Sequence, residues 1–489
     1  MSQTQTPGEA PPTESGRLES GTLGVSDLVF FVVAAAAPLT VMAGVAPLAI
    51  GFNGLGAPGG YLFAGIVLTL FAVGFTTMSR FVTNAGAFYA YIARGLGKPL
   101  GVGAALLAVF SYNAIEIGLA GALAFFVSGT VEELFGVATR WEIWAFLSIA
   151  LIGWLGYRRV TLSAKVLGVA LGLEVAILLV LAVPVLLTGG AAGFPFESFA
   201  PQNVFASGAG AVFALSFAAF IGFEATAIYS EEARDPSRTV PLATYIAVGF
   251  LALFYTLITW TIIVAFGPER ALSVAEQDPE GMFFTATTDY VGLWASVVMR
   301  VLIVTSAFAA TLAFHNAAAR YFYALGRERV LPRVLGRTHP TTHSPWVGGL
   351  AQTAIALVVV AGFALAGADP YLQLFLWTNG PGILGIIVLW AMCSVSIISF
   401  FRQESRGTGA WQRLVAPALA FAGLLLAAIL VVVKFDLLTG AGGPINAILI
   451  LSAAASFVAG VLRALYMRRN DPAAYGSLTT TDVEGDPVE

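Results

Sequence analysis

Three glutamates lie inside long uncharged stretches of the chain, where a carboxyl group can do chemistry. They are Glu116, Glu174 and Glu224. An ionised side chain at the middle of a bilayer costs roughly 2.5–3.5 kcal/mol on insertion scales, so such residues face the protein interior. We therefore regard each glutamate as a candidate to bind a proton, a cation or a substrate amine.

Glu174 is the candidate for ion coupling. It lies within the apolar segment 162–188. Because the loss of hydration favours the neutral form of a carboxyl group, we predict that this residue takes up and releases a proton. Two alternatives stay open. One is a structural hydrogen bond to a neighbouring helix, and the other is a sodium ligand, since carboxylate oxygens also bind hard cations.

Glu116 and Glu224 have other predicted roles. Glu116, in "FSYNAIEIGLAG", either contacts a substrate amine or bonds a neighbouring helix, and Tyr112 lies one helical turn before it on the same face. Glu224 follows Gly222 closely. We predict that its carboxylate accepts hydrogen bonds from backbone amides freed at a helix break, or links two helices during gating.

Histidine and cysteine give no signal for a metal or a cofactor. The chain has three histidines and one cysteine, Cys393, without a cluster at metal-ligand spacing. His315 has no partner in the sequence pattern and is predicted to be structural. We expect no metal and no cofactor. The net charge of −4 also argues against a nucleic-acid partner.

The elements that position these residues are predicted to be membrane helices. Of the 489 residues, 58% are hydrophobic and 11% are charged, against roughly 25% charged in soluble domains. A segment that crosses about 30 Å of hydrocarbon must satisfy its own backbone hydrogen bonds, so it is a helix. The twelve predicted spans are 26–52, 58–79, 99–130, 141–157, 162–188, 205–230, 239–266, 291–324, 346–367, 370–400, 412–434 and 444–467.

The distribution of basic residues predicts the orientation. If both termini are cytoplasmic, 20 of the 24 Lys and Arg residues fall on the cytoplasmic side, and this bias orients membrane proteins. We predict a multi-pass protein of the cell membrane, embedded in the lipid bilayer. Residues 1–22 and the acidic stretch 470–489 are read as disordered cytoplasmic tails around one membrane domain, 23–469.

Two predicted helices carry residues that interrupt a helix. Span 26–52 contains Pro38, Gly44 and Pro47, and span 205–230 contains Gly222. These weak points, five spans apart, predict two inverted repeats at about 26–188 and 205–400, with two extra helices at 412–467. Broken helices in such repeats meet at the midplane, where freed amides and carbonyls suit the two charges of an amino acid. The alternative is that Pro and Gly are simply common in membrane helices.

Four stretches resemble the amino acid–polyamine–organocation (APC) superfamily of permeases, which have the leucine-transporter-type fold. They are "NAGAFYAYIARGLG" (84–97), "RRVTLSAKVLGVALGLEV" (158–175), "FIGFEATAIYSEEARDPSRTVP" (220–241) and "FHNAAARYFYALGRERVLP" (314–332). The likeness covers roughly residues 24–465. It implies a secondary transporter domain of the APC type for amino acids or related amines.

The resemblance also implies where substrate and ion bind. The family's substrate contacts fall on the first break and the second break, at Ala37, Pro38, Leu39, Thr40, Ala218, Phe220, Ile221, Gly222 and Phe223. Many family members have an aromatic residue that gates the substrate site, and the corresponding position in this chain is Ala218. Either Phe217 or Phe220 takes over this role, or the substrate pocket is larger. Related folds have hydroxyl side chains of a cation site at the positions that correspond to Thr305 and Ser306. The sequence departs from the family pattern at "AAPLTVMAG", where many members have a Gly-Ser-Gly-like stretch, and at Glu174, where many have a lysine.

These observations predict a permease, not an enzyme, that moves amino acids by alternating access and is driven by protons, with sodium as the alternative ion. An amino acid or amine exchanger and a polyamine or organocation carrier are the closest alternatives. A membrane enzyme would need a catalytic constellation, and a nutrient sensor often adds a large soluble domain. The sequence does not predict the oligomeric state.

Overall fold

The computed structural model describes residues 23–82, 88–158, 164–224, 226, 233–339, 344–403 and 405–478. These residues are mostly helical, and one isolated bridge joins Leu23 to Ala233. The predicted tail 1–22 and the end of the acidic tail, 479–489, lie outside the described residues. So do parts of the quoted motifs, at 84–87, 159–163, 225 and 227–232.

The first half of the chain forms a series of long helices joined by short ones. In chain order they are α1 (Val25–Ala35), α2 (Pro38–Gly44), α3 (Ala46–Asn53), η1 (Gly54–Gly56), α4 (Ala57–Ser79), α5 (Phe88–Leu96), α6 (Lys98–Phe135), α7 (Trp141–Tyr157), α8 (Ala164–Thr188), η2 (Phe196–Phe199) and α9 (Pro201–Val204).

The second half of the chain continues in the same way. Its helices are α10 (Ala209–Ala218), α12 (Pro236–Phe266), α13 (Pro268–Gln277), α14 (Met282–Tyr290), α15 (Leu293–Arg327), η4 (Arg333–Gly336), α16 (Trp346–Leu365), the π-helix η5 (Pro370–Phe375), α17 (Leu376–Gln403), the π-helix η6 (Trp411–Val415), α18 (Ala416–Val433), α19 (Phe435–Thr439), α20 (Gly443–Asn470) and α21 (Pro472–Ser477).

Ten stretches of helix among the described residues are long and apolar enough to cross a bilayer, and the shorter apolar helices α7 and α10 accompany them. Helices are the expected form because the backbone polar groups of an apolar segment in lipid have only each other as partners. The prediction of an all-helical polytopic membrane protein is confirmed. The count of twelve spans and the division into two repeats stay predictions.

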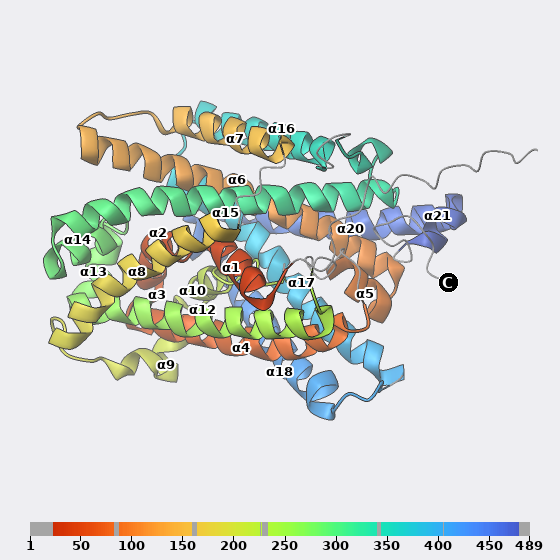
Figure 1. Ribbon diagram of the computed structural model, residues 1–489, viewed down its shortest axis with the longest axis horizontal. Helices are drawn as coiled ribbons and strands as arrows, with labels where there is room; N and C mark the ends of the chain where they lie inside the picture. The colour runs from red at the N-terminus through yellow and green to blue at the C-terminus, as the bar shows by residue number, and fades with distance from the viewer. Residues whose placement is uncertain are drawn as a thin grey trace, which may run out of the picture.

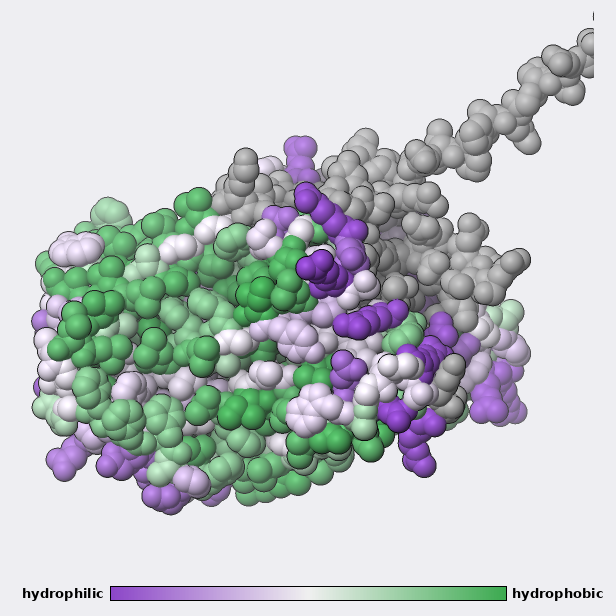
Figure 2. All heavy atoms as spheres, turned by 60° about the horizontal axis from the view of Figure 1, so that its bottom comes forward, coloured by the Kyte–Doolittle hydropathy of each residue, from purple (hydrophilic) through white to green (hydrophobic). Residues whose placement is uncertain are grey.

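The long helices run side by side along the longest axis of the molecule (Figure 1). The short helices α13 and α14 lie at one end of this bundle, and α5 and α21 lie toward the other (Figure 1). Figure 2 shows hydrophobic residues over much of one face and hydrophilic residues gathered most densely toward the end that carries α5 and α21. A broad apolar surface with polar ends is what a protein embedded in lipid requires.

Helix α6 lies at the centre of the packing. It contacts α7, α15, α17 and α20. Its approach to α20 depends on Gly460, because a Cβ added there would lie 2.4 Å from the carbonyl oxygen of Val102. Small residues allow such close contact between helices in lipid. Since α6 also carries Tyr112 and Glu116, this packing fixes both side chains in the interior.

Candidate functional site

The first helix interruption lies between α1 and α2. Helix α1 ends at Ala35 and α2 begins at Pro38, and Ala37 between them has a φ of 44°. Proline lacks an N–H group and disfavours the helical conformation in the residue before it, so the helix cannot run through this point. The amides of Leu39 and Thr40, in the first turn of α2, therefore need partners from outside the helix.

The second interruption follows α10. Helix α10 ends at Ala218, and Gly222 has a φ of 112°, a conformation that glycine adopts readily and other residues do not. A Cβ added to Gly222 would lie 3.5 Å from the Cβ of Ala35. The break predicted from Pro38 is thus present, and α10 ends before Gly222 as the second predicted break requires. The two segments lie against each other although they are far apart in the sequence.

A cavity of about 60 Å³ lies where the two interruptions meet. One wall comes from the interrupted segments and consists of Ala35, Ala36, Ala37, Thr40, Val41, Val45, Leu215, Ala218, Ala219 and Ile221. The other wall comes from α6, α15, η5 and α17 and consists of Ile115, Leu119, Ala310, Phe314, Phe375, Asn379 and Ile383. Four predicted substrate contacts, Ala37, Thr40, Ala218 and Ile221, line this cavity.

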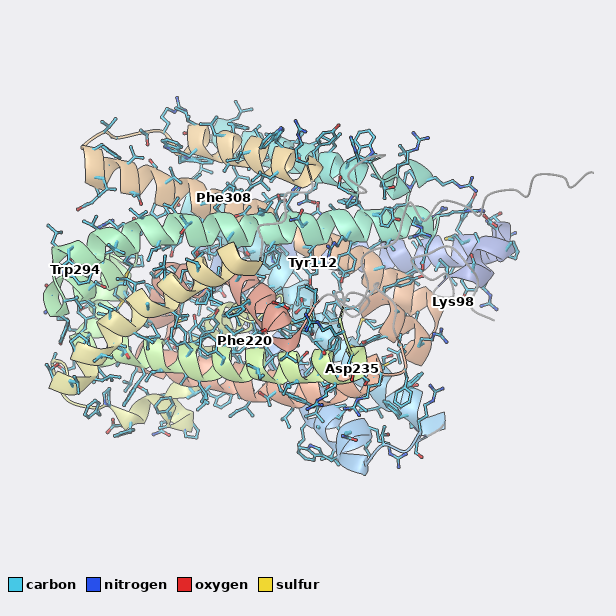
Figure 3. The ribbon with its side chains drawn as sticks, in the orientation of Figure 1. Lys98, Tyr112, Phe220, Asp235, Trp294 and Phe308 are labelled. Carbon is cyan, nitrogen blue, oxygen red and sulfur yellow. The ribbon has the colours of Figure 1, made fainter. Side chains whose placement is uncertain are left out.

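The three predicted aromatic contacts, Phe217, Phe220 and Phe223, pack elsewhere. Their rings meet Phe63, Tyr255 and Trp390, with centroid separations of 6.3, 5.9 and 5.5 Å respectively. In Figure 3, Phe220 and Tyr112 lie midway along the molecule, whereas Lys98 and Trp294 lie toward opposite ends. The phenylalanines therefore pack against α4, α12 and α17, and the cavity wall at this place is made of alanine and isoleucine.

Glu174 on α8 binds the start of α2. Its Oε2 accepts hydrogen bonds from the amide of Leu39 at 3.2 Å and from the hydroxyl of Ser306 at 2.7 Å. The Ser306 Oγ in turn accepts from the amide of Thr40 at 3.3 Å. A negative charge at this place is favoured because the amides at a helix N-terminus carry a partial positive charge. Glu174 and Ser306 therefore join α8 and α15 to the first interruption.

Thr305, the other predicted hydroxyl of the cation site, points away from this group. Its side chain is exposed, and its hydroxyl donates to the carbonyl of Leu302 in the same helix at 2.9 Å. Adjacent residues on a helix point in directions about 100° apart, so only one of this pair can face Glu174.

Glu224 binds the second interruption to α6. Its Oε2 accepts a hydrogen bond from the amide of Gly222 at 3.0 Å, and its Oε1 accepts from the hydroxyl of Tyr112 at 2.5 Å. The carboxylate thus contacts a backbone amide of the turn after α10 and links this turn to α6. Tyr112 does not share a partner with Glu116, one turn further along α6.

Glu116 belongs to a separate buried group. Its carboxylate faces Nδ1 of His315 at 3.1 Å and also accepts a hydrogen bond from the side-chain amide of Gln352. All three side chains are buried, and they join α6, α15 and α16. None of the three residues lines the cavity.

Several residues of the cavity wall and of the buried group around Glu116 were not predicted from the sequence. The wall of the cavity from η5 and α17, including Asn379, was missed, although "TNGPG" (378–382) places an amide, a proline and two glycines inside an apolar span. Gln352 was also missed, although it is an isolated amide within the apolar segment 346–367. A lone polar residue in a membrane helix is the signal that would have found both.

Interrupted helices with a cavity between the interruptions are the architecture of a class of secondary transporters. A model of the family described as amino acid permease matches residues 27–471 of this chain. The chain belongs to the amino acid permease family, within the APC superfamily.

Three relatives illustrate the similarity. An uncharacterised transporter of Mycobacterium tuberculosis (strain ATCC 25618 / H37Rv) is 28% identical over 39% of this chain and 40% of its own length. The cationic amino acid transporter 4 of Homo sapiens is 29% identical over 42% of this chain and 30% of its own. The branched-chain amino acid permease BcaP of Lactococcus lactis subsp. cremoris (strain MG1363) is 26% identical over 64% and 70%. The chain thus matches less than half the length of the first two relatives, and the names of the last two refer to different substrates.

Proposed function

We propose that this protein is a secondary active transporter that moves an amino acid across the cell membrane by alternating access, driven by protons. The observation that carries the proposal is the cavity between the two helix interruptions in a chain of the amino acid permease family. At such interruptions the backbone offers polar groups within the membrane without exposing them to lipid. A zwitterion has two charges that these groups can bind.

The ion-coupling site in this proposal is Glu174 with Ser306. The ionised carboxylate holds the amide of Leu39 and the hydroxyl of Ser306. Protonation removes the negative charge from the start of α2 and takes away one acceptor oxygen. Proton binding and the position of α2 are therefore linked, and α2 forms part of the cavity wall. Through this linkage, a proton gradient drives the transport of the substrate.

The second glutamate, Glu224, serves as a gate link in the same proposal. It ties Gly222, at the second interruption, to Tyr112 on α6. If the segment after α10 moves against α6 during alternating access, this pair must separate and form again. A hydrogen bond to a charged group contributes about 1.5–3 kcal/mol to the arrangement in which the two are paired.

The test is transport by the purified full-length protein in liposomes. Labelled amino acids and polyamines are offered outside, without sodium, at a pH below that of the interior. We expect one class of amino acid to accumulate above its outside concentration, and the accumulation to collapse when a protonophore is added. Liposomes without protein are the control.

Two other outcomes would change the proposal. Exchange of labelled for unlabelled amino acid without accumulation would show an exchanger. Uptake of polyamines in place of amino acids would show an organocation carrier. Absence of flux for every compound would contradict the proposal as a whole.

A further inference from the structure

We infer that the cavity selects amino acids with uncharged aliphatic side chains and rejects those with cationic side chains. The inference rests on the proposed function, since it names the substrate class of the same site. The family alone does not decide between these classes, because relatives named for branched-chain and for cationic substrates both match this chain.

The chemistry of the cavity wall suits an uncharged side chain. Among the described residues that line it, no side chain carries a charge, and Thr40 and Asn379 are the polar ones. One N–H of the Asn379 side-chain amide donates to the carbonyl of Phe375 at 2.9 Å, and neither polar side chain supplies a negative charge for an ammonium group. The remaining side chains of the wall are apolar.

The buried carboxylates lie outside the cavity wall. Glu116, Glu174 and Glu224 are 1%, 4% and 0% exposed, and none of them lines the cavity. Each already has its own donors: His315 and Gln352 for the first, Leu39 and Ser306 for the second, Gly222 and Tyr112 for the third. An ammonium group on a substrate side chain would therefore have to take a carboxylate from an existing pair.

An unpaired side-chain charge in this cavity costs free energy. An ammonium group removed from water without a counter-ion loses several kcal/mol of hydration, which the cavity wall does not replace. An aliphatic side chain of the same length loses nothing by leaving water and gains contact with Ile115, Leu119 and Ile383. These three side chains, on α6 and α17, face the helix interruptions and form the surface that meets the substrate side chain.

The sharpest comparison is between norleucine and lysine, because the two side chains have the same four-carbon chain and differ by the terminal ammonium. The full-length protein in liposomes is given labelled leucine, and each compound is tested as a competitor. We expect norleucine, leucine, isoleucine and valine to compete at least about tenfold better than lysine, which corresponds to about 1.4 kcal/mol.

A matched pair of variants assigns the selectivity to the cavity wall. Leu119→Asp introduces a carboxylate into the cavity, and Leu119→Asn introduces a side chain of nearly the same shape without a charge. We expect the norleucine preference over lysine to fall at least about tenfold in Leu119→Asp relative to Leu119→Asn. Equal preference in the two variants would overturn the assignment to this wall.

The wild-type protein keeps the inference testable even if a variant does not fold. Competition by lysine that equals or exceeds that of norleucine would overturn the inference and leave the proposed transport function standing. Failure of every amino acid to be taken up or to compete would overturn the proposed function and the inference together.

Discussion

At the scale of single residues, the buried glutamates differ in the donors that surround them. Glu174 is held by a backbone amide and a serine, Glu224 by a backbone amide and a tyrosine, and Glu116 by a histidine and a glutamine. The two that bind backbone amides do so at helix interruptions, and the third joins three continuous helices. We therefore expect Glu174 and Glu224 to respond to substrate, and Glu116 to stabilise the packing of the three helices.

The link between Tyr112 and Glu224 gives a prediction at this scale. Tyr112→Phe leaves a buried carboxylate oxygen without its donor, so we expect a loss of about 1–3 kcal/mol in stability and a slower transport rate. Tyr61→Phe is the control, because the buried Tyr61 hydroxyl has no hydrogen-bond partner among the described residues. Thermal melting in detergent and uptake in liposomes measure the two effects. Equal melting shifts in both variants would contradict a special role for this pair.

At the scale of elements, the interruptions of α1–α2 and of α10 decide where the cavity lies. Gly222 offers a test, because its φ of 112° strains any side chain and its Cβ position faces Ala35. We expect Gly222→Leu to abolish substrate binding by filling the space between the interruptions, and Gly222→Ala to lower the melting temperature. Gly249→Ala is the control, since an added Cβ there meets nothing within 4 Å. Binding of labelled substrate by Gly222→Leu at wild-type affinity would refute the proposed location.

The elements also show how far a sequence can predict such a site. Pro38 and Gly222 could be recognised as interruptions because their effect on the backbone is local. The partner of Glu116 could not be recognised, since His315 is 199 residues away and is brought to it by the packing of α15 on α6. The apolar part of the cavity wall from α17, at Ile383, was missed for a related reason. An all-round apolar helix does not show from its pattern which face meets the cavity.

At the scale of the whole molecule, the predicted orientation has its own test. Cys393 is buried, so Cys393→Ser provides a background in which single exposed cysteines can be placed. Gln277→Cys, at the end of α13, and Ala410→Cys, before η6, lie at exposed positions. In intact cells we expect a membrane-impermeant maleimide to label the first and to label the second only after the membrane is permeabilised. The reverse pattern would show that the termini face outward.

The account as a whole depends on Glu174 as the residue through which protons drive transport. The most direct measurement compares accumulation and exchange in liposomes containing the wild-type protein or Glu174→Gln, with Glu142→Gln as the control. Glu142 is paired with Arg140 at the start of α7 and does not line the cavity. Glutamine keeps an acceptor oxygen for the amide of Leu39 but cannot gain or lose a proton at neutral pH. We predict that Glu174→Gln loses accumulation driven by a pH gradient and retains exchange, while Glu142→Gln retains both; pH-driven accumulation at the wild-type level in Glu174→Gln would contradict the account.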